Sequence, residues 1–275
     1  MSLSIKYSIV FVSFVFFSFF STVISFSPLQ ALQASQASYC DSTSITEWTC
    51  ETCDPTMTFE SIVEHHGERG ILGVYEKERV LLVAFRGSSN IQNWLDNVQF
   101  SRICPYEDAP DVCVEKGFYK VFEYMKEDVM KELMRLSGTY GTQKVVCTGH
   151  SLGAAVATLF AYHIQQEYGA KWDVSLITFG SPRIGNKAFV EGGPRHGLRI
   201  THATDMVVHV PQMILGYEHV PHEEWYNEDN SDSMECDDED GEDPNCSDSC
   251  GPLRCTSVDD HLYYLNISLG TDGDC

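Results

Sequence analysis

The order of apolar and polar positions along the chain predicts alternating strands and helices. Apolar runs at 71–75 and 80–85, separated by a polar turn, predict a hairpin that ends at Arg86. Further apolar patterns predict helices over 116–136 and 154–168, and strands at 144–148, 174–179, 198–203 and 261–267. Strands that alternate with helices are typical of an α/β fold, with a mostly parallel central sheet flanked by helices.

The first residues have the pattern of a secretory signal peptide. One basic residue, Lys6, precedes an apolar and serine-rich run that continues to Phe26, and small residues lie at its end. The run is also near the ~20 residues that span a bilayer, so an uncleaved anchor is the competing interpretation. We expect residues 1–27 to be removed, 28–39 to form an N-terminal segment, and 40–275 to form a single domain without stable membrane insertion.

The sequence VVCTGHSLGAA contains the pattern G-x-S-x-G around Ser151. The pattern alone arises by chance in roughly one chain in ten of this length. Here it follows a predicted strand and leads directly into a predicted helix, as a nucleophile elbow requires. Gly149 and Gly153 leave room for a tight turn, and the helix N-terminus places positive backbone dipole near an oxyanion. The sequence therefore predicts that Ser151 is a nucleophile.

A serine nucleophile needs a histidine base, and the histidine needs a carboxylate. The acid should follow a later strand, and Asp205 comes two residues after the strand at 198–203. The alternative is that Asp205 caps a turn. The base should come later still, which favours His261 over His209, because His209 is only four residues from Asp205. The sequence predicts the triad Ser151, Asp205 and His261.

Two hydrogen-bond donors are expected for the oxyanion of a tetrahedral intermediate. One is the backbone N–H of Leu152, and the other comes from the loop at 86–89, where Ser88 can donate. The segment after this loop has a short apolar face at helical spacing. This face consists of Ile91, Trp94, Leu95 and Val98. A surface helix docked on the core is the alternative, but the place of this segment after the oxyanion loop favours a mobile lid over an apolar site.

The charge of the chain excludes some classes of partner. The formal net charge is −22, and the segment from Glu223 to Asp243 holds twelve acidic side chains and no basic one. Nucleic acid and anionic membrane surfaces would repel such a chain. The acidic run lacks the spacing of a calcium-binding loop, so we interpret it as a solvated acidic loop and expect no metal.

Eleven cysteines fit an oxidising compartment and agree with secretion to the extracellular space. Cys147 lies inside an apolar run, so we expect it to be a buried free thiol. Two sequons, at Asn245 and Asn266, permit glycosylation. The first overlaps a cysteine that we expect in a disulfide and the second a predicted strand, so we expect neither to be fully occupied.

Seven segments taken in order resemble the secreted class 3 lipases of fungal type, which are members of the α/β-hydrolase fold. They are AFRGSSNIQNW, KGFYKVF, VVCTGHSLGAA, ITFGSPRIGN, TDMVVHVP, GYEHVPHEEWY and DDHLYYLNI. The resemblance covers roughly residues 40 to 275. It implies the triad named above, an oxyanion hole at Ser88 and Leu152, and a lid between Ile91 and Val98. Ala154 and Thr204 depart from the usual family pattern, although neither exchange bears on the chemistry.

The resemblance also implies three disulfides, Cys40–Cys275, Cys50–Cys53 and Cys236–Cys246. The remaining cysteines are paired by proximity along the chain as Cys104–Cys113 and Cys250–Cys255. The Cys50-x-x-Cys53 spacing alone does not indicate a zinc site, because no second pair of ligands follows at the spacing of a zinc finger.

We therefore expect a secreted, monomeric serine carboxylester hydrolase that acts on neutral acylglycerols at a lipid–water interface, with no cofactor. The first alternative is a feruloyl esterase of plant cell walls, which shares the fold and triad but tends to have a more polar lid. A second alternative, from another class, is a secreted lipid-binding protein that keeps the fold without catalysis.

Overall fold

The computed structural model describes residues 26–194, 196–236, 241–250, 254–270 and 275. Most of the predicted signal peptide, residues 1–25, lies outside the described residues. Within the described part of the chain, no helix has the length and apolar character needed to cross a bilayer.

The centre of the molecule is an eight-stranded sheet in the order β1-β2-β3-β6-β7-β8-β9-β10. Strands β3, β6, β7, β8 and β9 are parallel to one another, whereas β1, β2 and β10 pair antiparallel at the two edges. The strands of this sheet are β1 (Thr58–His65), β2 (Glu68–Tyr75), β3 (Val80–Phe85), β6 (Lys144–His150), β7 (Asp173–Phe179), β8 (His196–His202), β9 (Glu223–Tyr226) and β10 (Ser233–Glu235). Two short pairs stand apart: β4 (Arg102–Ile103) with β5 (Val114–Glu115), and β11 (Tyr263–Tyr264) with β12 (Ile267–Ser268).

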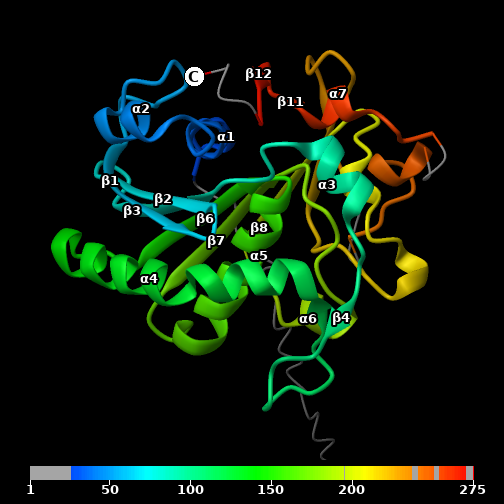
Figure 1. The fold of residues 1–275 in the computed structure, drawn as a ribbon, viewed down its shortest axis with the longest axis horizontal. Helices are drawn as coiled ribbons and strands as arrows, with labels where there is room; N and C mark the ends of the chain where they lie inside the picture. The colour runs from blue at the N-terminus through cyan, green and yellow to red at the C-terminus, as the bar shows by residue number, and fades with distance from the viewer. Residues whose placement is uncertain (1–25, 195, 237–240, 251–253, 271–274) are drawn as a thin grey trace, which may run out of the picture.

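Helices cover both faces of the sheet (Figure 1). The α-helices are α1 (Pro28–Ala37), α2 (Ser42–Glu47), α3 (Ile91–Asn97), α4 (Lys116–Tyr140), α5 (Leu152–Tyr168), α6 (Lys187–Glu191) and α7 (Val258–His261). Three 3₁₀ turns are η1 (Val207–His209), η2 (Met213–Leu215) and η3 (Ser247–Cys250). Helices α4 and α5 pack on one face, and α1 packs on the other. These findings confirm the predicted α/β fold with a mostly parallel sheet.

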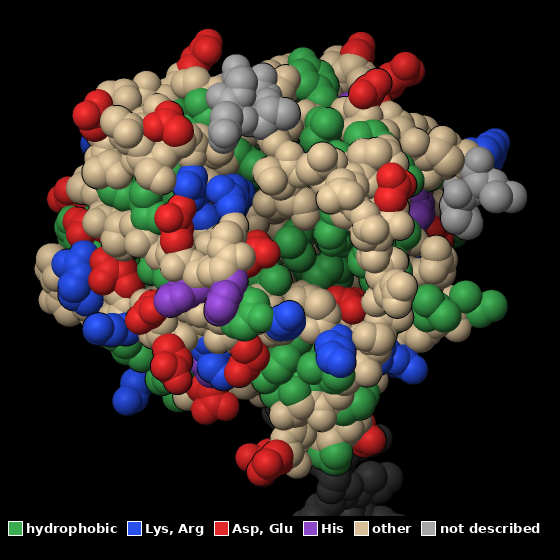
Figure 2. Space-filling view, in the orientation of Figure 1, with side chains coloured by type: hydrophobic (Ala, Val, Ile, Leu, Met, Phe, Trp, Pro, Cys, Tyr) green, Lys and Arg blue, Asp and Glu red, His purple; other side chains and the backbone are tan. Residues whose placement is uncertain are grey.

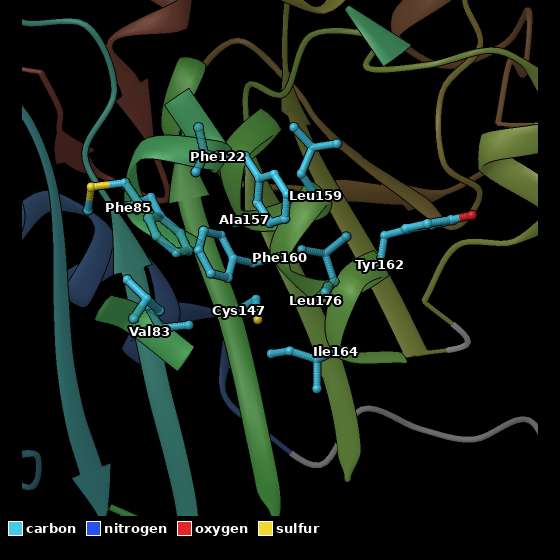
Figure 3. Close-up of a cluster of buried hydrophobic side chains, with 14 of the residues drawn as sticks. Val83, Phe85, Phe122, Cys147, Ala157, Leu159, Phe160, Tyr162, Ile164 and Leu176 are labelled. Carbon is cyan, nitrogen blue, oxygen red and sulfur yellow. The ribbon is translucent and has the colours of Figure 1, made fainter. Parts of the chain in front are cut away.

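Alternate residues of the central strands point to opposite faces of the sheet, as the period of a strand requires. On β3, Val83 and Phe85 belong to the core beneath α4 and α5, whereas Leu82 and Ala84 belong to the core beneath α1. Figure 3 shows the first of these cores, where the Phe85 ring stacks on Phe160 with centroids 4.6 Å apart. Because both faces of the sheet are covered, β3 is apolar at every position. The resulting continuous apolar run is the pattern that predicted this strand from the sequence.

The core beneath α4 and α5 also holds Cys147, which is buried and free, as the sequence predicted. Ten other cysteines form the five expected disulfides: Cys40–Cys275, Cys50–Cys53, Cys104–Cys113, Cys236–Cys246 and Cys250–Cys255. The first of these ties the end of α1 to the last residue of the chain. The N-terminal segment at 28–39 contains α1, which covers the sheet, and Ser35 Oγ lies 3.1 Å from Thr148 Oγ1 of β6.

Strand β1 was not predicted from the sequence. It lies at the edge of the sheet, and only Val63 among its eight residues is buried. An edge strand with one buried position carries neither a continuous apolar run nor a clear alternation. Its pairing with β2 comes from tertiary structure.

The predicted strand at 261–267 is wrong. This segment contains the end of α7 and the two-stranded hairpin β11–β12. Leu265 and Asn266 have φ values of 47° and 65°, as the two central residues of a tight hairpin turn often do. The sequon residue Asn266 is consequently exposed in a turn, not placed inside a strand.

The interpretation of residues 223–243 as a solvated loop is also wrong in part. The segment supplies β9 and β10 of the central sheet. Glu223 is buried and lies 3.2 Å from Arg199 of β8, and Glu242 lies 2.6 Å from Arg183. An arginine offsets the cost of burying each of these carboxylates, and both arginines come from earlier parts of the chain. A count of charges within the acidic run could not reveal them.

Candidate active site

Ser151 occupies a strained turn between β6 and α5. Its φ and ψ are 61° and −128°, a conformation that residues other than glycine adopt rarely. A Cβ at Gly149 would collide with the backbone of Gly153, and a Cβ at Gly153 would collide with the Phe85 carbonyl of β3. The turn is therefore closed too tightly for any side chain at either glycine.

The structure brings Asp205 and His261 together, 56 residues apart in the sequence. His261 Nδ1 donates to Asp205 Oδ2 at 2.8 Å, and both side chains are fully buried. Asp205 also accepts from the Tyr264 hydroxyl at 2.6 Å and from the Val207 N–H at 2.7 Å. Burial alone would raise the pKa of Asp205, but His261 and these donors lower it below the usual value. Asp205 is therefore held as a carboxylate beside His261.

Two buried atoms of the predicted triad have no hydrogen-bond partner among the described residues. They are Ser151 Oγ and His261 Nε2. Because Nδ1 is engaged with Asp205, Nε2 is the nitrogen that remains to take a proton. Hydrogen bonds of this kind are often long before substrate binds.

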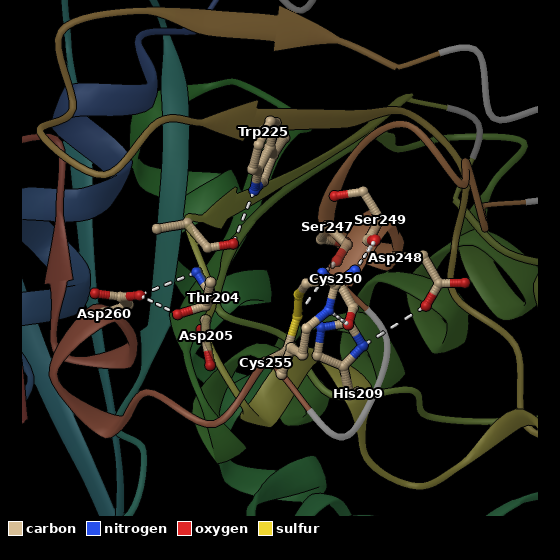
Figure 4. The surroundings of a disulfide bond; sticks show 12 residues. Thr204, Asp205, His209, Trp225, Ser247, Asp248, Ser249, Cys250, Cys255 and Asp260 are labelled. Atoms are coloured by element: carbon tan, nitrogen blue, oxygen red, sulfur yellow. Dashed lines mark hydrogen bonds and ion pairs between the residues drawn. A yellow bond between two sulfur atoms is a disulfide. The ribbon is translucent and has the colours of Figure 1, made fainter.

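The loop that carries Asp205 is held from outside the triad (Figure 4). Thr204 donates through N–H and Oγ1 to Asp260 Oδ2, at 3.0 and 2.7 Å. The Trp225 indole donates to the Ala203 carbonyl at 3.1 Å. His209, the competing base, has its Nδ1 3.6 Å from Asp248 and faces away from the triad acid.

The predicted oxyanion residues border one pocket of about 380 Å³. Ser88 and Leu152 line it together with Trp94 and Val98 of the predicted lid segment. A Cβ at Gly87 would lie 3.1 Å from Ser151 Cβ, so the loop before Ser88 passes directly over Ser151. Figure 2 shows hydrophobic side chains in a hollow on this face of the molecule.

The predicted lid segment forms α3, which the Asn90 side chain caps at its N-terminus. Ile91 is buried, and Trp94 and Leu95 are half-buried. The Trp94 ring lies 6.3 Å from Phe100 and 6.4 Å from Phe118, measured between centroids. Helix α3 lines the pocket with Asn93, Trp94 and Asn97, whereas Ile91 and Leu95 do not border it.

Two groups of side chains have the spacing of a metal site among the described residues. They are His209 with Cys250 and Cys255, and Glu223 with Cys236 and Cys246. The cysteines of each group are joined in a disulfide, so neither group offers a thiolate. Neither group is therefore a metal centre of the zinc–thiolate kind.

Sequence reasoning missed two tyrosines of the site. Tyr264 contacts Asp205, although it lies in the segment DDHLYYLNI that carries the resemblance. Tyr39 contacts His150, the residue before Ser151, with its hydroxyl 2.9 Å from His150 Nδ1. Tyr39 lies outside the catalytic segments in the sequence, and no local pattern marks it.

Gly180 offers a direct test of this geometry. Its φ is +54°, and a Cβ there would lie 2.9 Å from Asp205 Oδ2 and 2.9 Å from His261 Nδ1. We expect Gly180→Ala to lower kcat by roughly 10²-fold, because displacements near 1 Å in a catalytic pair have effects of this size. Steady-state turnover of a soluble p-nitrophenyl ester measures it. Gly141→Ala, at φ +61° with only the Arg79 guanidinium nearby at 3.9 Å, controls for backbone strain and should keep kcat.

Two buried histidines predict a dependence of stability on pH. Burial lowers the pKa of His150 to about 3 and that of His219 well below 6.5. The folded protein keeps both neutral, whereas unfolded histidines protonate near pH 6.5. Their contribution to stability is therefore complete above pH 6.5 and is lost as the pH falls toward 3.

We expect His219→Gln to make the unfolding free energy fall less steeply as the pH drops below 6.5, by at most about 1.4 kcal/mol per pH unit, the value for one proton. Urea unfolding at several pH values measures this slope. An equal slope in the variant and the natural protein would contradict the prediction.

Comparison with known proteins places the chain in a family. Residues 82–214 match the family model described as lipase (class 3). The lipase of Rhizomucor miehei is 30% identical over 234 residues, which cover 81% of this chain. The chain belongs to the class 3 lipase family. As in the known members of the class 3 lipases, the sheet and its helices form an α/β-hydrolase fold.

Solved structures agree with this membership. The Rhizomucor miehei triacylglyceride lipase superimposes with a TM-score of 0.79 at 28% identity, covering 88% of this chain and 94% of that one. A triacylglycerol lipase whose catalytic centre is a serine protease triad superimposes with a TM-score of 0.77 at 29% identity, covering 88% of this chain and 94% of that one. The chain spans 63% of the full length of the curated Rhizomucor miehei relative.

Proposed function

We propose that this class 3 lipase family member is a carboxylic ester hydrolase that acts on acylglycerols. The observation that carries the proposal is the buried pair of His261 and Asp205 beside a serine on a strained elbow. Relatives with triacylglycerol lipase chemistry support the same reaction. No metal or cofactor is needed for it.

In the proposed reaction, His261 Nε2 takes the proton of Ser151 Oγ as that oxygen attacks the ester carbonyl. The backbone N–H groups of Ser88 and Leu152 donate to the oxyanion. His261 then gives its proton to the departing alcohol, which leaves an acyl group on Ser151. Water, deprotonated by the same His261, releases the fatty acid. Asp205 remains a carboxylate and stabilises the His261 cation.

Two apolar surfaces support a lipid–water interface as the place of reaction. Helix α3 borders the pocket with Trp94, and Val98 directly after the helix also lines it, as a lid segment would. The turn η2 exposes Met213, Ile214 and Leu215, and Ile214 is 92% exposed. Exposed apolar clusters of this kind favour contact with lipid. We propose that α3 is a lid that moves at such a surface.

Secretion as a monomer belongs to the same proposal. Five disulfides suit an oxidising, extracellular environment. Phe26 is buried against Tyr75, with ring centroids 4.9 Å apart. We therefore place signal cleavage ahead of Phe26, slightly before the boundary at residue 27 that the sequence suggested.

The deciding experiment measures the hydrolysis of emulsified triolein and of methyl ferulate. A shorter triacylglycerol is also measured below and above its solubility limit. We expect hydrolysis of the triacylglycerol to rise when an interface forms. Turnover of methyl ferulate without triolein hydrolysis would favour the feruloyl esterase alternative. Failure of an alkyl phosphonate to label Ser151 would favour a lipid-binding protein without catalysis.

A further inference from the structure

A buried chain of hydrogen bonds connects Tyr39 to the catalytic base. The Tyr39 hydroxyl lies 2.9 Å from His150 Nδ1, and His150 Nε2 lies 2.7 Å from the backbone carbonyl of His261. All three side chains are at most 3% exposed. We call the pair Tyr39 and His150 the Tyr39–His150 bridge.

The direction of these hydrogen bonds follows from the chemistry of each atom. The His261 carbonyl can only accept, so His150 Nε2 carries the hydrogen. Burial keeps His150 neutral by lowering its pKa to about 3, so its Nδ1 has a free lone pair. The Tyr39 hydroxyl must then donate to Nδ1. Its oxygen remains free to accept from another group.

The residue beside the Tyr39 oxygen is Gly87. Gly87 directly precedes Ser88, and a Cβ at Gly87 would collide with both the Tyr39 hydroxyl and the His150 carbonyl. The absence of a side chain is what allows this close approach. The bridge therefore begins at the loop that carries Ser88 and ends at the backbone of His261.

The end at His261 meets an unsatisfied helix terminus. His261 is the last residue of α7, and carbonyls in the last turn of a helix lack partners within the helix. His150 supplies the partner, and its ring lies 4.5 Å from the His261 ring. A fixed His261 backbone limits the positions that its imidazole can take between Asp205 and Ser151.

We propose that Tyr39 is a positioning residue of the reaction. Through the Tyr39–His150 bridge it fixes the position of the base, His261, relative to the loop that carries Ser88. This proposal rests on the proposed function, because the reaction that Tyr39 would support is the ester hydrolysis proposed above. Tyr39 touches neither substrate nor Ser151 Oγ in this role. It acts through His150 and Gly87.

We expect Tyr39→Phe to lower kcat for a soluble p-nitrophenyl ester roughly 10-fold, the cost of one lost hydrogen bond, with KM within two-fold. The rate of inactivation by diethyl p-nitrophenyl phosphate should fall by a similar factor. Tyr217→Phe is the matched control, because the buried Tyr217 hydroxyl has no hydrogen-bond partner among the described residues. The proposal would be overturned if Tyr39→Phe kept both kcat and the inactivation rate within two-fold of the natural protein.

A second pair of variants keeps the test decisive if Tyr39→Phe folds poorly. His150→Gln retains an N–H donor for the His261 carbonyl, whereas His150→Leu removes it. We expect the glutamine variant to keep at least five-fold more kcat than the leucine variant. Equal losses in the two would count against the bridge.

Urea unfolding supplies a measure that does not depend on catalysis. If the bridge exists, the Tyr39→Phe/His150→Leu double variant is no less stable than His150→Leu alone, because the first change has no partner left to lose. Fully additive losses would overturn the bridge. A natural protein that failed to react with the organophosphate would instead count against the proposed function and leave this stability test standing.

Discussion

Ser151→Ala is expected to lower kcat by at least ~10⁴-fold while the protein stays folded. The reason is that the alanine has no oxygen to attack the ester, and the only activity left comes from the oxyanion donors and substrate binding. Steady-state hydrolysis of a soluble ester measures the loss, and circular dichroism reports the fold. Residual activity within ten-fold of the natural protein would rule out Ser151 as nucleophile.

The backbone of Ser151 allows a sharper version of this experiment. Alanine keeps the strain of φ 61° and ψ −128°, whereas glycine adopts this conformation readily. We expect Ser151→Gly to be equally inactive but more stable than Ser151→Ala by about 1 kcal/mol. Urea unfolding of the two inactive proteins measures the difference. Equal stability would mean that the elbow stores no strain.

Asp205→Asn is expected to lower kcat by ~10³- to 10⁴-fold, the size of effect known when a triad carboxylate becomes an amide. Asp205 accepts from His261, Tyr264 and Val207, and all of these donors are buried with it. An amide nitrogen facing His261 Nδ1 favours the wrong tautomer, so Nε2 can no longer accept the serine proton. The measurement is kcat on the soluble ester across the pH range.

Tyr264→Phe is the graded control for this change. It removes one of the three donors to Asp205 and keeps the carboxylate and its bond to His261. We expect a loss of roughly 10-fold, the usual cost of one buried hydrogen bond to a charge. A loss in Asp205→Asn no larger than that in Tyr264→Phe would contradict the assignment of Asp205 as the triad acid.

Much of the candidate site was predictable from the sequence because its signals are local. The strand before Ser151, the small residues around it and the helix after it are contiguous, and a nucleophile elbow needs all three together. Asp205 follows the end of β8, a place that parallel sheets give to ligands. In this fold the base follows the acid along the chain, and His261 is the last histidine of the sequence.

Other features depend on partners far along the chain. Tyr39 and His150 are 111 residues apart, and Tyr264 and Asp205 are 59 residues apart. The acidic run showed no basic neighbour, although Arg199 of β8 is buried against Glu223. No local pattern marks these residues, because each makes its contact only when the parallel strands bring distant segments to the same edge of the sheet.

The sequence by itself determined the apolar strands, the long helices and the tight turn at Ser151, since burial on both faces and the steric demands of a turn act on neighbouring residues. Only the tertiary structure decided how the N-terminal segment, the acidic run and the C-terminal hairpin are arranged around that turn. Buried polar groups must find partners wherever the fold supplies them, and at Tyr39, Glu223 and Tyr264 it supplies them from distant parts of the chain.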